Sequence, residues 1–86
     1  MNIKKELIKR EIAGESFLIP VGRTVYDANG LYALTEVGAF LWDLLPEAQN
    51  EEELLRAVLE TYDVSRTEAA ADIAAFLEKL RKMEIL

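Results

Sequence analysis

The sequence contains no cysteine and no histidine among its 86 residues. Without cysteine there are no disulfides, no thiolate metal ligands and no cysteine nucleophile. Without histidine the usual general base and the commonest metal ligand are missing as well. The composition therefore argues against an ordinary hydrolase and against a zinc protein.

Positive charge is also scarce, because ten Lys and Arg residues face 16 Asp and Glu residues. The formal net charge of −6 repels phosphate backbones, so nucleic acid is not an expected partner. No apolar run approaches the ~18 residues of a membrane span. Charges also interrupt the N-terminal segment 1–11, unlike a signal peptide. We expect a soluble, cytoplasmic protein with no membrane partner.

Hydrophobic residues make up 51% of the chain, which is enough to fill one core at this length. No repeat, linker or low-complexity tract divides the sequence. We therefore expect a single domain over residues 1–86.

The first part of the chain has the pattern of a β-hairpin, over residues 6–21. Gly14-Glu15 suits a two-residue turn with glycine first, which places Ile12 opposite Phe17. One face is then apolar (Ile8, Ile12, Phe17, Ile19, Val21), and the other is a mixed polar surface (Lys9, Glu11, Leu18, Pro20).

A second hairpin is predicted from Asn29-Gly30, a dipeptide that suits a tight turn because both positions adopt positive φ. Its strands are residues 24–28 and 31–34. Thr35 follows at once and has the side chain of a helix N-cap. The sequence therefore predicts a strand that passes directly into a helix.

Three helices are predicted in the second half, each with a capping residue before an apolar stripe at helical spacing. The third has apolar positions over a broader arc than one contact needs, so it can serve two surfaces. The boundaries are Thr35 to a stop at Pro46, Asn50 as cap of Glu51–Tyr62, and Ser65 as cap of Arg66–Met83.

The small and apolar residues of this region resemble the PqqD family of peptide chaperones, also called RiPP recognition elements, which serve ribosomally made, post-translationally modified peptides. The resemblance covers nearly the whole chain. Two departures are Thr35, where asparagine or serine is frequent, and Glu84, where glycine is frequent. The matching residues are Leu34-Thr35, Val37, Gly38, Ala39, Leu41 and Trp42, then 51–62, then Asp72-Ile73, Phe76-Leu77 and Leu80.

The resemblance implies an α+β, winged-helix-like fold with a three-stranded antiparallel sheet packed on three helices. It also implies a non-catalytic function: the domain binds the leader segment of a precursor peptide and delivers it to a modifying enzyme, often a radical SAM maturase. The leader adds as a strand beside the third strand, in a groove walled by the third helix. The peptide-binding residues implied here are Leu31, Tyr32, Ala33, Leu34, Ile73, Phe76, Leu77, Lys79 and Leu80.

Simpler explanations exist for most of these residues. The apolar ones could fill the core between sheet and helices, and Lys79 lies near a helix C-terminus, where the dipole favours cations. Glu51, Glu52 and Glu53 begin a helix, so the dipole and cap explain them without a metal. No tyrosine has an activating partner in sequence, and no phosphate-binding glycine loop is present. We assign no catalytic residue, no metal ligand and no cofactor.

Two other functions compete with peptide capture. A winged-helix DNA-binding or transcription-associated domain needs a basic recognition helix, whereas residues 51–62 contain only Arg56 against four glutamates. A homodimer, formed when the open sheet edge pairs with its own copy, is the third interpretation.

Overall fold

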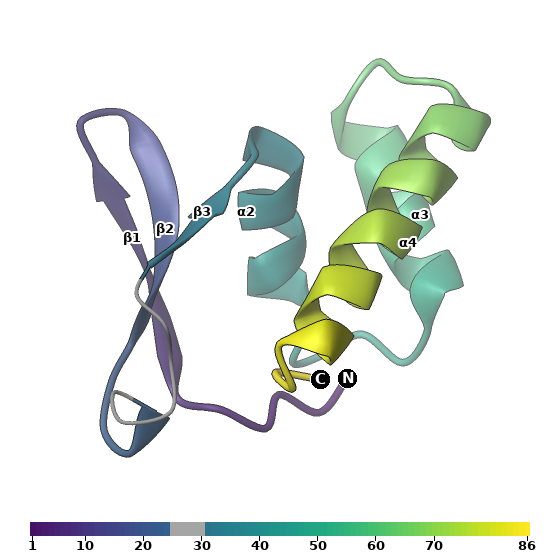
Figure 1. Ribbon diagram of the computed structural model, residues 1–86. Helices are drawn as coiled ribbons and strands as arrows, with labels where there is room; N and C mark the ends of the chain where they lie inside the picture. The colour runs from purple at the N-terminus through teal and green to yellow at the C-terminus, as the bar shows by residue number, and fades with distance from the viewer. Residues whose placement is uncertain (25–30) are drawn as a thin grey trace.

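The computed structural model describes residues 1–24 and 31–86. In these residues an antiparallel sheet precedes three helices (Figure 1), which confirms the predicted α+β class. The predicted strand 24–28 and the Asn29-Gly30 turn fall, apart from Thr24, outside the described residues. The elements are β1 (Leu7–Ile12), β2 (Glu15–Pro20), β3 (Tyr32–Leu34), α2 (Glu36–Leu44), α3 (Glu51–Thr61) and α4 (Arg66–Lys82).

The first hairpin forms with a turn one residue earlier than predicted. Ile12 pairs with Glu15, so the turn residues are Ala13 and Gly14, with φ of 53° and 82°. Positive φ at both positions is the geometry of a type I′ turn, whose twist matches that of the strands. The prediction was wrong because it gave the left-handed conformation to glycine alone, whereas Ala13 adopts it too. The resulting pairing slides by two residues, which leaves each side chain on its predicted face.

The face of this hairpin that turns toward the helices is the mixed polar one, not the apolar one. Leu18 is fully buried in the core, and its cross-strand partner Lys9 lies on the same face. Lys9 can point inward because its ammonium group forms an ion pair with Asp43 of α2 and also donates to the Ala39 carbonyl (3.4 Å). The supposed polar surface is therefore the inner face of the sheet.

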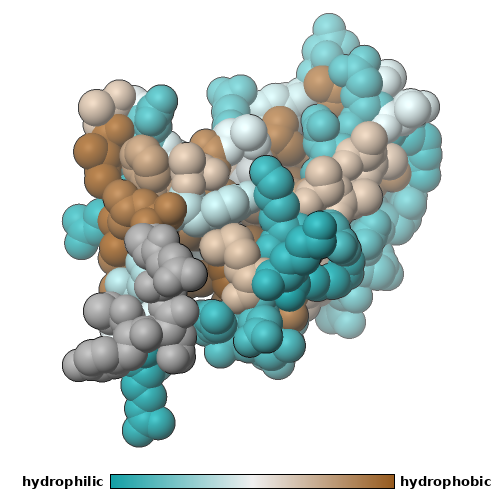
Figure 2. Space-filling view, viewed as in Figure 1, coloured by the Kyte–Doolittle hydropathy of each residue, from teal (hydrophilic) through white to brown (hydrophobic). Residues whose placement is uncertain are grey.

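The outer face of the sheet consequently exposes apolar side chains. Ile8 and Ile12 keep 37% and 47% of their surface exposed. In Figure 2, residues coloured as hydrophobic gather over the hairpin of β1 and β2.

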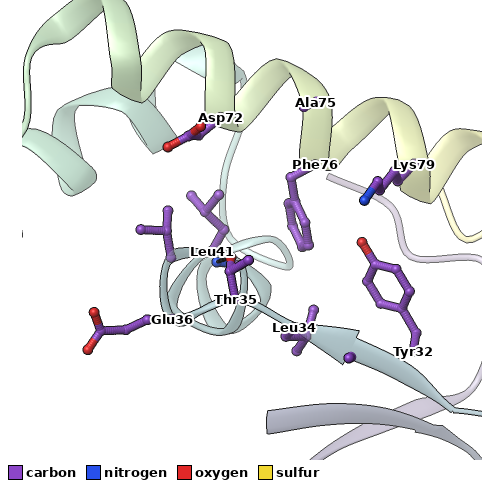
Figure 3. Close-up of a pocket in the computed structure, with 12 residues that line it drawn as sticks. Tyr32, Leu34, Thr35, Glu36, Leu41, Asp72, Ala75, Phe76 and Lys79 are labelled. Carbon is purple, nitrogen blue, oxygen red and sulfur yellow. Dashed lines mark hydrogen bonds between the residues drawn. The ribbon is translucent and has the colours of Figure 1, made fainter. Parts of the chain in front are cut away.

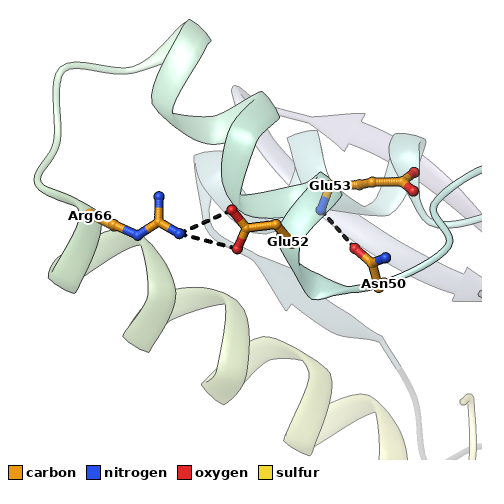
Figure 4. A network of polar contacts seen from close by, with 4 residues as sticks. All are labelled: Asn50, Glu52, Glu53 and Arg66. Carbon is orange, nitrogen blue, oxygen red and sulfur yellow. Dashed lines mark hydrogen bonds and ion pairs between the residues drawn. The ribbon is translucent and has the colours of Figure 1, made fainter.

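The predicted helix starts are confirmed by their capping bonds. The Gly38 amide donates to Thr35 Oγ1 (3.0 Å), the Glu53 amide donates to Asn50 Oδ1 (3.0 Å), and the Glu68 amide donates to Ser65 Oγ (3.1 Å). Each bond satisfies a helical N–H that has no intrahelical partner. Figure 4 shows the Asn50 cap together with Arg66, which donates to both carboxylate oxygens of Glu52 at 3.0 and 3.2 Å and so joins α3 to α4.

The core lies mainly among the three helices, with Leu18 as the fully buried residue that the sheet contributes. The helix α2 contacts β2 and β3 as well as α3 and α4. The two ends of the chain lie side by side, joined by a hydrogen bond from the Lys4 amide to the Ile85 carbonyl (2.7 Å). No helix among the described residues combines the length and the apolar composition that crossing a bilayer requires. The largest fully buried side chains are Leu18, Leu41, Leu45, Leu54, Val58, Ile73, Leu77, Leu80 and Ile85.

The last helix ends in a Schellman motif centred on Glu84. The Ile85 amide donates to the Leu80 carbonyl (2.8 Å), and the Glu84 amide donates to the Arg81 carbonyl (3.0 Å). Glu84 has a φ of 59°, the left-handed conformation that glycine adopts without strain. Glycine, which is frequent at this position in the family that the sequence resembles, would adopt this conformation without strain.

We expect Glu84→Gly to raise the free energy of unfolding by about 1 kcal/mol, because it removes a side chain from a left-handed position. Chemical denaturation followed by circular dichroism measures this. Lys82→Gly is the matched control: its position is helical, so glycine there is expected to cost about 1 kcal/mol. Equal destabilisation by both substitutions would contradict the assignment.

Candidate functional site

The β3 strand forms one edge of the sheet. The strand order is β1-β2-β3, and within residues 1–24 and 31–86 β3 pairs only with β2. Along its other side, backbone N–H and C=O groups face outward without a strand partner from the described chain. Such an edge is a template on which a further extended chain can pair.

A cavity of about 400 Å³ opens beside this edge. Figure 3 shows β3 and the first turn of α2 on one side and α4 on the other, with Phe76 pointing from α4 into the space between them. The lining residues are Tyr32, Ala33, Leu34, Thr35, Glu36, Val37, Gly38, Leu41, Asp72, Ala75, Phe76 and Lys79.

The wall from α4 is a single helical row. Asp72, Ala75, Phe76 and Lys79 are spaced three, one and three residues apart, which places them on one face. Ala75 is small and exposed, so this wall is recessed in its middle. The row therefore presents an acidic end, an apolar centre and a basic end.

The floor of the cavity depends on Gly38 in the first turn of α2. A Cβ atom at this position would lie 3.1 Å from Thr35 Oγ1 and 3.5 Å from the nearest atom of the Phe76 ring. A Cβ would therefore crowd the Thr35 hydroxyl, which accepts the Gly38 amide, whereas it would meet Phe76 at an ordinary van der Waals distance. The direct passage from β3 into α2 brings these residues beside the edge strand.

Tyr32 stands at the basic end of the cavity, with its hydroxyl directed toward the side of Lys79 (Figure 3). Burial raises the pKa of Tyr32 above its ordinary value of 10.0. Its phenol is therefore neutral at physiological pH and serves as a hydrogen-bond donor or acceptor.

The raised pKa of Tyr32 has a consequence for stability in alkali. Between its unfolded and folded pKa values the folded state holds a proton that the unfolded state has lost, so stability falls as pH rises past about 10. Between about pH 9 and about pH 11, we expect the free energy of unfolding to fall less in the Tyr32→Phe variant than in the parent chain. Urea denaturation at both pH values measures this, and identical losses would contradict it.

The structure divides the predicted site residues into three groups. Tyr32, Ala33, Leu34, Phe76 and Lys79 line the cavity. Leu31 precedes β3 and is 56% exposed, outside the lining. The remaining three, Ile73, Leu77 and Leu80, are buried in the core, where they support the α4 wall from behind.

Sequence reasoning missed the contribution of α2. Thr35, Glu36, Val37, Gly38 and Leu41 line the cavity, although the sequence showed them only as a cap and a packing stripe. On α4 it also missed Asp72 and Ala75. The helical row through Phe76 and Lys79 was the available signal for these two, because both lie on it.

Chemistry at this site is limited by the side chains present. Over residues 1–24 and 31–86 there is no cluster of three acidic, histidine or cysteine residues that could hold a metal ion. What the cavity offers is backbone pairing, apolar contact and three exposed charges.

The fold and the cavity define a small α+β domain whose sheet edge opens onto a helix-walled groove. The sequence model for coenzyme PQQ synthesis protein D (PqqD) matches residues 17–86, and the chain therefore belongs to the PqqD family.

A solved structure, "TbiB1 in Complex with the TbiA(beta) Leader Peptide", is similar in fold and sequence. It shares 29% identity with this chain at a TM-score of 0.74, and the match covers 100% of this chain and 94% of the other. No curated protein matches the chain.

Proposed function

We propose that this protein is a RiPP recognition element that captures the leader segment of a precursor peptide by strand addition at β3. The observation that carries the proposal is the open β3 edge beside the groove formed with α4. Family membership and the likeness to a protein whose structure was solved in complex with a leader peptide support it.

The energetics of such binding are sufficient. Each main-chain hydrogen bond contributes about 1 kcal/mol net, so three or four give about half of what micromolar affinity needs. One or two apolar anchors, each contributing about 1.5 to 3 kcal/mol when buried, supply the remainder. The apolar centre of the groove, around Phe76, Leu34 and Leu41, is the surface for such anchors.

We propose that residues 1–86 act as one non-catalytic domain that presents the bound peptide to a modifying enzyme, for which a radical SAM maturase is the leading class. Holding the substrate beside an active site raises its effective concentration there. The absence of histidine and cysteine from the sequence supports a binding role over catalysis.

Titration with the leader of a precursor peptide encoded beside this gene tests the proposal. We expect the amide resonances of Leu31 to Leu34 to shift on saturation in ¹H–¹⁵N NMR spectra, because an added strand bonds to their backbone. The amide of Arg56, on the exposed surface of α3, provides an internal control. Unchanged β3 amides at saturating leader would overturn strand addition at this edge.

Self-association competes for the same edge. We propose that two copies pair through β3 as a homodimer when leader is absent, since an open edge pairs with any extended chain. Native mass spectrometry should then show dimers that leader peptide converts to monomers. Dimers that persist at saturating leader would place self-association elsewhere.

A further inference from the structure

The groove beside β3 is electrically polarised along its length. Asp72 of α4 and Glu36 of α2 lie on opposite walls toward one end, and Lys79 lies at the other end, near Tyr32 (Figure 3). Between them the walls are small or apolar: Leu34, Ala75 and Phe76.

These three charges have no partner within the described chain. Four ion pairs occur among residues 1–24 and 31–86, and none of them includes Asp72, Glu36 or Lys79. The other cations of the last turns of α4 behave differently, since Arg81 pairs with Glu51 and Lys82 pairs with Glu78. Within residues 1–24 and 31–86, a ligand would therefore displace no ion pair when it contacts the groove charges.

The spacing of the groove charges fits an extended chain. Asp72 and Lys79 are seven residues apart on a helix, which is about 10.5 Å at 1.5 Å per residue. An extended peptide rises about 3.3 Å per residue and presents alternate side chains to one face, so positions four apart span about 13 Å. Long charged side chains can bridge the difference between these two lengths. The peptide residue midway between the two charged positions then contacts Phe76.

We take the added peptide strand to run antiparallel to β3. Both existing pairings are antiparallel, and antiparallel pairing is slightly more stable per residue than parallel pairing. An antiparallel chain begins beside Leu34, the end of β3 that leads to Glu36, and finishes beside Tyr32. The N-terminal end of the peptide therefore lies at the acidic end of the groove, and its C-terminal end lies at Lys79.

We infer that the groove selects a leader segment of the order basic, any, apolar, any, acidic, read from N- to C-terminus. This inference rests on the proposed strand addition and adds to it the charge pattern of the peptide. The basic side chain meets Asp72 and Glu36, the apolar one packs on Phe76, and the acidic one meets Lys79.

Two capped synthetic peptides of identical composition test the inference. Both carry the same serine-threonine flanks, one around Arg-Thr-Leu-Thr-Glu and the other around Glu-Thr-Leu-Thr-Arg. Because their net charges are equal, the protein's overall charge of −6 does not favour either. We expect the first to bind about tenfold more tightly at low ionic strength, and this ratio to shrink in high salt as exposed charge contacts are screened.

A charge exchange in the protein provides the matched control. The double variant Asp72→Lys with Lys79→Glu keeps the net charge and replaces exposed side chains only. We expect it to abolish or invert the preference between the two peptides, measured by NMR titration of both proteins.

The outcomes separate this inference from the proposed function. Equal binding of the two peptides, binding of neither, or a preference that survives the charge exchange would overturn the charge pattern. Strand addition itself is decided by the titration with a natural leader, which does not depend on the designed sequences.

Discussion

Replacing Ala75 by tryptophan is expected to weaken leader binding at least about tenfold, because the large ring would fill the recess in the α4 wall where an apolar anchor contributes about 1.5 to 3 kcal/mol. Ala75 lines the cavity and is exposed, so the substitution does not disturb the core. Fluorescence anisotropy with a labelled leader measures the dissociation constant.

Ala74→Trp is the control for this substitution. Ala74 is the neighbouring exposed alanine of α4 and lies outside the cavity lining. It adds the same ring to the same helix, so leader affinity should stay at the parent value. Comparable losses from both substitutions would show that the α4 wall beside β3 is not the binding surface.

Leu77→Ala is expected to lower the free energy of unfolding by about 3 kcal/mol, a large part of the stability of a small domain. Leu77 is 0% exposed and lies in the core cluster, so its truncation removes apolar contacts and leaves a cavity. Urea denaturation followed by circular dichroism measures this.

Leu31→Ala is the control for Leu77→Ala. Both leucines were predicted as site residues, but Leu31 lies on the surface. Because Leu31 is 56% exposed, its truncation should change stability by less than about 0.5 kcal/mol. A small effect at Leu77, or a large one at Leu31, would contradict the assignment of Leu77 to the core and Leu31 to the surface.

Local chemistry made the helices predictable. Thr35, Asn50 and Ser65 were identified as caps from residue type and spacing alone, and each accepts an amide of its own first turn. These interactions span three residues, so their outcome does not depend on the rest of the fold. The strand that passes directly into α2 was predictable for the same reason.

Hairpin register and facing were harder to predict. The Ala13-Gly14 turn places alanine in a left-handed conformation that residue preferences disfavour, and the gain from strand pairing outweighs that local cost. The inward face is the one that buries Leu18 in the helical core. Lys9 on the same face is accommodated because its ammonium group donates to Asp43, which lies 34 residues away. A pattern of alternating apolar residues contains no information about such a distant partner.

The sequence predicted the β3 side of the candidate site but not the α2 side. Tyr32, Ala33 and Leu34 were expected at the edge, and they line the cavity. The α2 side was missed, because it depends on the distance between the first turn of α2 and Phe76 of α4. That distance is a property of the packed helices.

The sequence by itself determined the class of elements, their caps, the family resemblance and the lack of histidine and cysteine chemistry, because all of these depend on residue type and short spacing. Only the tertiary structure decided which face of the hairpin is inward, which apolar residues of α4 are core, and that Glu36, Asp72 and Lys79 share one groove. Packing brings together side chains that are far apart in the chain, and the pattern along the chain does not encode which of several apolar faces finds which partner.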